Sequence, residues 1–220
     1  FNGNVIHFCL NELFIKINES ARNINDVNDI EIEKIIEMSM KQYYESDEVN
    51  SQYGKTERFN TTFKLLKNAI FQVAIRLKDE FTNIKFTPTD FEYEFGKDYK
   101  ETPLTLTASD GTRIAFYGKI DRIDTFKNGD DIYIRVVDYK TGTVELSLAN
   151  LLYGINTQMF LYLFALTESS DEIKKSGKYK NMLPAGILYM PATEITPQKS
   201  RNSSEDALKK HINDTFNMKC

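Results

Sequence analysis

The sequence contains only two cysteines, Cys9 and Cys220, which lie near opposite ends of the 220 residues. They form no CxxC spacing, so the chain lacks the pairs needed for a disulfide framework or for a multi-cysteine zinc or iron–sulfur site. Long hydrophobic runs are also absent: the longest, Met159 to Leu166, is too short to cross a bilayer. Such a chain is typical of a reducing compartment, and we expect a cytoplasmic protein with no membrane partner.

The chain has fewer positive than negative side chains: 28 Lys and Arg against 32 Asp and Glu, which gives a net charge of -4. No overall positive field attracts nucleic acid, so any role with nucleic acid must come from a local site. A basic segment followed by an apolar one, as in a signal peptide, is also missing. The chain begins with Phe1 and stops abruptly at Cys220, which predicts a single domain over 1–220 cut from a longer protein.

The spacing of apolar residues predicts that the first third of the chain is helical and that a sheet follows. From about Phe86 the period shifts towards two. Asp110-Gly111 and Asn128-Gly129 are hairpin-turn dipeptides, because both residue types tolerate the positive φ of a primed turn. The predicted helices span Asn4 to Ile17, Ile30 to Tyr44, Thr56 to Phe81 and Ser147 to Thr167; the predicted strands include Arg113 to Phe126, Asp131 to Lys140 and Ala185 to Met190; Thr196 to Asp206 is predicted to be a loop.

The segment that carries chemistry runs from Gly118 to Asp124 and resumes after a turn at Val136 to Gly142. Asp138 and Lys140 are two apart on a strand, so they project from the same face with Cα atoms about 7 Å apart. If the hairpin pairs as its turn indicates, Asp121 approaches Asp138 across the two strands. Two carboxylates and one ammonium then surround a small volume, and a divalent cation would offset the cost of that clustering.

This grouping predicts metal-assisted phosphodiester hydrolysis. The carboxylates would hold Mg²⁺, with Mn²⁺ as the alternative, and a metal-bound water would act as the nucleophile. Lys140 would position that nucleophile or stabilise the transition state. The alternative is an ordinary surface salt bridge on an edge strand, which is the commoner origin of an isolated D-x-K.

The order G-x-I-D-R-I-D, hairpin, V-V-D-Y-K-T-G and a helix with Gln158 and Tyr162 resembles the RecB-like branch of the PD-(D/E)XK nuclease superfamily. It looks most like the C-terminal nuclease domain of AddB-type subunits of bacterial helicase–nucleases. The resemblance covers nearly the whole chain, from Gly3 to the strand at Pro184 to Ile187. It implies an α+β, restriction-endonuclease-like fold with a mixed central sheet flanked by helices. It also implies a Mg²⁺-dependent deoxyribonuclease, an exonuclease in DNA end processing and recombinational repair.

The resemblance assigns roles to individual residues. The metal ligands would be His7, Asp121, Asp138 and the backbone carbonyl of Tyr139, and the catalytic residues would be Asp121, Asp138, Lys140, Gln158 and Tyr162. The implied partners are DNA, in single-stranded form, and a helicase subunit or helicase domains outside this chain. Members of this family typically carry a four-cysteine iron–sulfur cluster beside the nuclease domain, and this chain has no matching cysteines.

Residues around these positions have simpler expectations. His7 lies at the edge of the apolar stripe of its helix, where a side chain can face a cleft and not the core. From the residues alone a structural histidine is the commoner interpretation of such a position, and it is the resemblance that favours a ligand. Arg122 and Asp124 project to the strand face opposite Asp121, so we expect them to form a structural pair. His211 matches no motif and is expected to be solvated.

Two other functions remain open from the sequence. One is a stand-alone or phage-type exonuclease of the same superfamily. The other is a degenerate nuclease fold that acts as a DNA-binding or scaffolding module. The presence of Asp121, Asp138 and Lys140 together argues against degeneracy, because a module without chemistry has no need of that combination.

Overall fold

The structure is a computed structural model that describes residues 2–46, 57–96, 104–140, 142, 147–168 and 181–192. The expected loop Thr196 to Asp206 and His211 lie outside these residues. Contacts divide the chain into two compact units. The first comprises Phe1–Ile84, Tyr139–Thr143 and Met190–Met218, and the second comprises Lys85–Asp138, Val144–Tyr189 and Lys219–Cys220.

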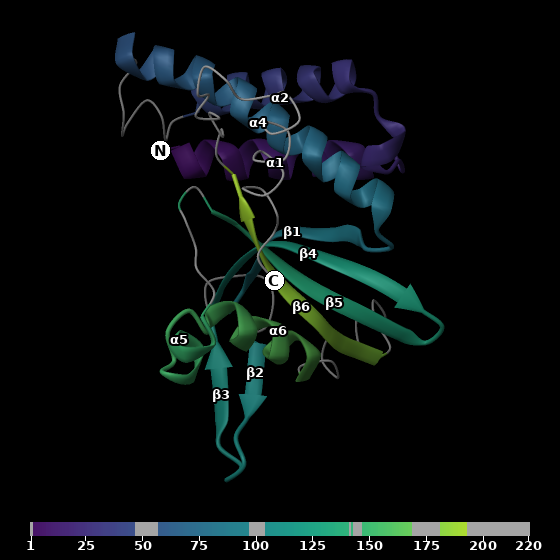
Figure 1. The fold of residues 1–220 in the computed structure, drawn as a ribbon, viewed down its shortest axis with the longest axis vertical. Coiled ribbons are helices and arrows are strands. Elements are labelled where there is room, and N and C mark those ends of the chain that lie inside the picture. The colour runs from purple at the N-terminus through teal and green to yellow at the C-terminus, as the bar shows by residue number, and fades with distance from the viewer. Residues whose placement is uncertain are drawn as a thin grey trace, which may run out of the picture. The chain divides into compact units, whose positions relative to one another are not determined.

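The first unit is built on helices α1 (Asn2–Glu19), α2 (Asp29–Tyr44) and α4 (Glu57–Asn83), with a short 3-10 helix η1 (Ile24–Asp26) between α1 and α2 (Figure 1). The three helices predicted in this region are confirmed, with ends within two residues of those predicted. Their apolar stripes pack together, and the Phe14 and Phe81 rings meet edge to face at 6.0 Å. The buried residues of this core include Val5, Leu10, Leu13, Phe14, Ile32, Ile36, Ile70, Val73 and Leu77.

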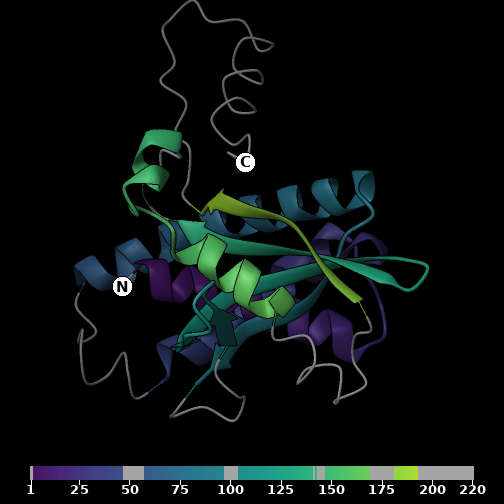
Figure 2. The ribbon, with the colours of Figure 1, turned by 90° about the horizontal axis from the view of Figure 1, so that it is seen from below.

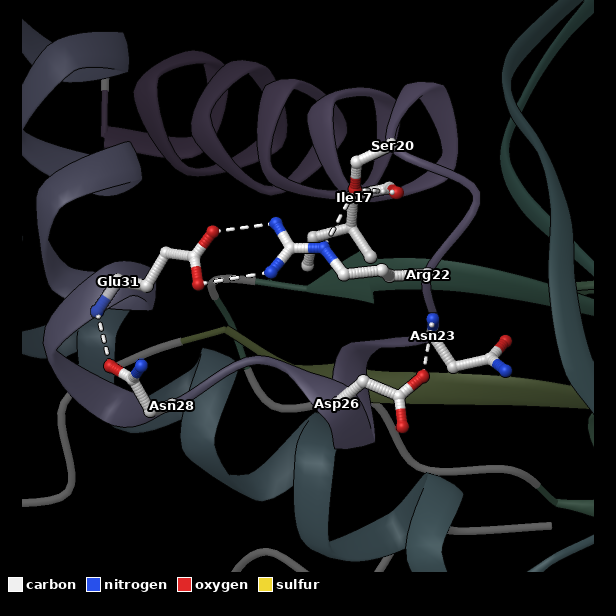
Figure 3. Close-up of polar contacts among 7 residues, drawn as sticks. All are labelled: Ile17, Ser20, Arg22, Asn23, Asp26, Asn28 and Glu31. Carbon is white, nitrogen blue, oxygen red and sulfur yellow. Dashed lines mark hydrogen bonds and ion pairs between the residues drawn. The ribbon is translucent and has the colours of Figure 1, made fainter.

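Short-range polar contacts fix the connection between α1 and α2 (Figure 3). The Arg22 guanidinium donates two hydrogen bonds to the Glu31 carboxylate, at 3.1 and 2.6 Å. Asn28 is the N-cap of α2, and its side chain accepts a hydrogen bond from the Glu31 backbone N–H. Asp26 accepts one from the Asn23 N–H. The start of α2 is therefore set by local sequence.

Cys9 gives a direct test of how tightly α1 is packed. Its side chain is fully buried, and that burial, with a smaller contribution from Glu12 opposed by Lys16, raises the pKa of the thiol to about 12. The thiolate is the reactive form. In a Cys220→Ser variant we expect no alkylation by iodoacetamide in the native state near pH 8 and full alkylation after unfolding in urea, measured by mass spectrometry. Rapid native alkylation would contradict this packing.

The second unit contains most of a four-stranded sheet in the order β1-β4-β5-β6, and the last residues of β5 and β6 are assigned to the first unit. The strands are β1 (Thr87–Phe95), β4 (Gly118–Asn128), β5 (Asp131–Lys140) and β6 (Asn181–Pro191). β4 runs antiparallel to both of its neighbours, β1 and β5. The central position of β4 matters for the site, because side chains on this strand have a neighbouring strand on each side.

The segment predicted as one strand from Arg113 to Phe126 is divided at Tyr117, so that prediction is wrong. Its first part is β3 (Arg113–Phe116), which pairs with β2 (Leu104–Thr107) in a separate two-stranded sheet. The division follows from the length of β1, which ends at Phe95 opposite Gly118 and offers no partner to earlier residues.

Both predicted hairpin turns are present, with one correction. Gly111 lies in the turn between β2 and β3 and has a φ of +84°. At the second turn Asn128 pairs with Asp131, so the two loop residues are Gly129 and Asp130 and not Asn128-Gly129. Gly129 takes a φ of +63°, which its missing Cβ permits.

The helix predicted over Ser147 to Thr167 is also two elements, α5 (Leu148–Leu152) and α6 (Gln158–Glu168). The chain turns between them, where Gly154 and Asn156 have φ of +76° and +60°. α6 lies along the sheet (Figures 1 and 2) and packs on it through the core residues Met159, Tyr162, Leu163, Leu166, Ile123, Ile134, Val136 and Ile187. Within the described ranges, a search for a helix of the length and apolarity that a bilayer requires finds none.

Candidate active site

Asp121 lies on the central strand β4 and has a carboxylate beside it on each neighbouring strand. In the register of β1 with β4, Phe91 pairs with Arg122 and Tyr93 pairs with Ile120. Glu92 therefore lies opposite Asp121. A carboxylate oxygen of Glu92 lies within 4.8 Å of one of Asp121, and both residues are half-buried. Residues opposite each other in neighbouring strands have side chains close enough to interact.

Asp138 stands on the other side. The β4–β5 ladder ends at the pair of Arg122 and Val137, and Asp121 and Asp138 are the next residues on the two strands. Asp138 is also half-buried. Glu92, Asp121 and Asp138 therefore form a row of three acidic residues across β1, β4 and β5. Like charges on neighbouring strands repel one another, and a cation placed among them lowers that repulsion.

Lys140 follows Asp138 by two residues and ends β5, where it is half-buried. Its backbone carbonyl accepts a hydrogen bond of 2.8 Å from the Ala192 N–H, just beyond the end of β6. This bond fixes the backbone at the end of β5. The Cα atom from which the Lys140 side chain extends is therefore held in place.

His7 and Tyr139 lie together in the first unit. The Nε2 atom of His7 is 3.0 Å from the backbone carbonyl oxygen of Tyr139, and the two rings meet edge to face at 5.7 Å. A carbonyl only accepts, so this hydrogen bond requires the proton on Nε2. A ring nitrogen that carries a proton cannot ligate a metal, so Nε2 of His7 would have to release this hydrogen bond, with the proton on Nδ1, to act as the ligand that the resemblance implies.

Gln158 and Tyr162 are joined by a hydrogen bond of 2.7 Å from the Gln158 amide to the phenol oxygen. Tyr162 is buried and meets the ring of Phe95 edge to face at 5.0 Å. A Cβ atom at Gly118 would lie 2.3 Å from the phenol oxygen, so a side chain there would displace Tyr162. The glycine of the G-x-I-D segment thus lets the phenol sit against the start of β4, three residues before Asp121.

Residues 2–217 match the model of the PD-(D/E)XK nuclease superfamily. The chain belongs to this superfamily. Its helices and mixed four-stranded sheet form the α+β, restriction-endonuclease-like fold of PD-(D/E)XK nucleases, as the sequence predicts.

Three curated relatives are each named as the B-type subunit of an ATP-dependent helicase/deoxyribonuclease. The protein from Exiguobacterium sibiricum is 33% identical over 187 residues, which is 85% of this chain and 16% of the relative. The protein from Clostridioides difficile is 30% identical over 163 residues, 72% of this chain and 14% of the relative. The protein from Clostridium acetobutylicum is 27% identical over 217 residues, 99% of this chain and 18% of the relative. The chain thus spans less than a fifth of the length of these relatives.

Behind the acidic row of this member of the PD-(D/E)XK superfamily lies a buried ion network. The fully buried Asp124 accepts hydrogen bonds from Arg122, at 2.8 and 3.0 Å, and from Arg135, at 2.8 Å. The sequence predicted the Arg122–Asp124 pair, which is confirmed, but not the participation of Arg135. The network connects β4 to β5 on the face opposite Asp121, and a fully satisfied buried network holds its strands rigidly.

Glu92 was not predicted from the sequence as a site residue. Its backbone has a φ of +49°, which is rare for a residue with a side chain and costs on the order of 1–3 kcal/mol. The only available signal was the alternation of acidic residues at Asp90, Glu92 and Glu94 on the predicted strand. Three half-buried carboxylates supply the hard oxygen ligands that Mg²⁺ and Mn²⁺ prefer, so the residues present fit such an ion.

Proposed function

We propose that the chain is a divalent-metal-dependent deoxyribonuclease domain that hydrolyses phosphodiester bonds. The observation that carries this proposal is the row of acidic residues on β1, β4 and β5, in a chain that belongs to a nuclease superfamily. In the proposal Asp121 and Asp138 hold Mg²⁺ or Mn²⁺. His7 and the Tyr139 carbonyl are proposed as further ligands, as the resemblance implies.

A bound divalent cation supplies an activated water and neutralises charge that develops on the phosphate. Around it, the ammonium of Lys140 positions the nucleophile or stabilises negative charge in the transition state. Gln158 and Tyr162 hold the substrate backbone from α6. Because the Gln158 amide already donates to the phenol oxygen, the phenol retains its own proton for donation to a phosphate oxygen.

The substrate and the partners follow from charge and from the relatives. A chain with a net charge of -4 and a row of carboxylates repels DNA, so delivery by other domains or subunits would help binding. The relatives are named as helicase/deoxyribonuclease subunits. We therefore propose that the domain acts in a helicase–nuclease, on single-stranded DNA that the helicase delivers, as an exonuclease in DNA end processing and recombinational repair.

The test is cleavage of labelled oligonucleotides, single-stranded and duplex, by the chain in Mg²⁺, Mn²⁺, Ca²⁺ or EDTA at fixed low salt. We expect cleavage in Mg²⁺ or Mn²⁺, none in EDTA, and a preference for single strands. A circular single strand serves as the matched substrate, because an exonuclease needs an end and should leave the circle intact.

Fluorescence anisotropy separates this proposal from a degenerate DNA-binding module. The proposal expects poor binding of oligonucleotides in EDTA and stronger binding of single strands in Ca²⁺. Tight binding of duplex in EDTA, together with no cleavage in any metal, would instead support a binding module. Cleavage that is unaffected by EDTA would contradict the role of a metal.

A further inference from the structure

Lys119 contacts two carboxylates on the face of the sheet that carries Asp121. Its ammonium forms a close ion pair with Glu92 and lies 3.6 Å from Glu94. The Glu92 side chain is 19% exposed, whereas those of Lys119 and Glu94 are 43% and 46% exposed. The more enclosed of the two carboxylates is therefore the one nearer the ammonium, where water screens the pair least.

Glu92 also lies close to Asp121. One of its oxygens lies within 4.8 Å of an oxygen of Asp121, and Asp121 follows Lys119 by two residues on β4. The same carboxylate thus has an ammonium on one side and a second carboxylate on the other. It stands where a cation bound at Asp121 would meet it.

The backbone at Glu92 distinguishes it from its neighbours. Among the described residues, three that are not glycine have positive φ: Ala21, Glu92 and Asn156. Ala21 follows the end of α1, and Asn156 lies between α5 and α6, both in connections where this conformation is common. Glu92 lies inside β1. Strained backbone within a regular strand is concentrated at functional sites, where it redirects a side chain.

Charge on this face matches a divalent ion. Glu92, Glu94 and Asp121 contribute three negative charges and Lys119 one positive charge, which leaves a net charge of -2. The ammonium of Lys119 offsets one of these negative charges and lies within ion-pair distance of both Glu92 and Glu94.

We propose that Glu92 is a third carboxylate of the metal site and that Lys119 holds it in the metal-free protein, so that metal binding exchanges one cation for another on Glu92. This inference rests on the proposed metal-dependent function. Lys119 is a positioning residue in this exchange, and it sets metal affinity, because the ammonium competes with the metal for the same carboxylate.

The experiment is Mn²⁺ titration of the chain by isothermal calorimetry, which needs no substrate. Glu92→Gln should weaken Mn²⁺ binding by about tenfold to hundredfold, as is common when groups around a metal site are altered. Glu94→Gln is the matched control, because it removes the same charge from the same face of β1, and it should change affinity by no more than about threefold. Thermal unfolding without metal checks that both variants fold.

Variants of Lys119 test the exchange itself. Lys119→Met should tighten Mn²⁺ binding severalfold, because the competing cation is gone, and Lys119→Arg should keep the affinity within about threefold of the wild type. The tightening should be smaller when Lys119→Met is made in the Glu92→Gln background. Weaker binding in Lys119→Met would overturn the competition.

Asp121→Asn separates this inference from the proposed function. If Asp121→Asn weakens Mn²⁺ binding strongly while Glu92→Gln behaves like Glu94→Gln, the metal site stands and Glu92 is only the ion-pair partner of Lys119. If Asp121→Asn leaves Mn²⁺ binding unchanged, the proposed metal site itself fails. Weaker binding in Asp121→Asn and Glu92→Gln, but not in Glu94→Gln, supports both.

Discussion

Replacing Asp138 with asparagine is expected to reduce DNA cleavage at least about a hundredfold, while the free energy of unfolding without metal holds or rises. The loss follows because the variant lacks a carboxylate ligand, and removal of a group that stabilises transition-state charge commonly costs 10²–10³-fold. The variant should be at least as stable because Asp138 and Asp121 follow the last pair of the β4–β5 ladder, on neighbouring strands, and removing one of the two negative charges relieves their repulsion. The measurements are initial cleavage rates and urea unfolding in EDTA.

Asp130→Asn is the matched control for this variant. Asp130 lies in the exposed turn that joins β4 to β5, so its replacement removes the same charge outside the acidic row. Cleavage by this control should stay close to that of the wild type. If Asp138→Asn keeps more than about a tenth of the wild-type rate, Asp138 is not a ligand on which catalysis depends.

Asp124→Asn is expected to lower the free energy of unfolding by about 3–5 kcal/mol, because it removes the buried negative charge that pairs with the guanidinium groups of Arg122 and Arg135. Asp124 is fully buried and accepts three hydrogen bonds from these two residues. Urea unfolding followed by circular dichroism, in EDTA, measures the change.

Asp121→Asn is the natural comparison, since it is the same substitution three residues earlier on the other face of β4. It should hold or raise stability, as expected for Asp138→Asn, because it removes charge from a row of like charges. The same chemical change on one strand thus has opposite effects on its two faces. Equal destabilisation by both variants would contradict the division of β4 into a site face and a structural face.

Local sequence patterns predicted most of the helices and strands. The predictions failed where the end of an element depends on pairing with a distant part of the chain. The helices of the first unit follow from apolar spacing and, at the start of α2, from its capping residue Asn28, and Gly111 and Gly129 mark the two tight turns. The break between α5 and α6 was missed because the apolar stripe continues through the turn at Gly154. The split at Tyr117 depends on where β1 ends, which no local pattern reveals.

The site shows the same limit. Asp121, Asp138 and Lys140 were predicted because they flank one short hairpin, and Gln158 and Tyr162 because they are one helical turn apart. Glu92 reaches the row through the pairing of β1 with β4, and the β2–β3 hairpin separates these strands in the chain. Arg135 joins the buried network through a cross-strand register. Residues adjacent in sequence indicate neither the proximity of Glu92 to Asp121 nor that of Arg135 to Asp124.

In the chain, the β2–β3 hairpin lies between β1 and β4, which are neighbours in the sheet. This position makes the hairpin a site where the chain can gain residues during evolution. β1 and β4 keep their register whatever the chain does between Phe95 and Gly118, and the tip of the hairpin around Gly111 is exposed. The entropy of closing a flexible loop rises slowly, by about 0.6 kcal/mol for each doubling of length. Insertions or fused modules at this tip would therefore leave Glu92 opposite Asp121. The tip of the β2–β3 hairpin is thus a position where added residues could form new contacts without changing the arrangement of the acidic row.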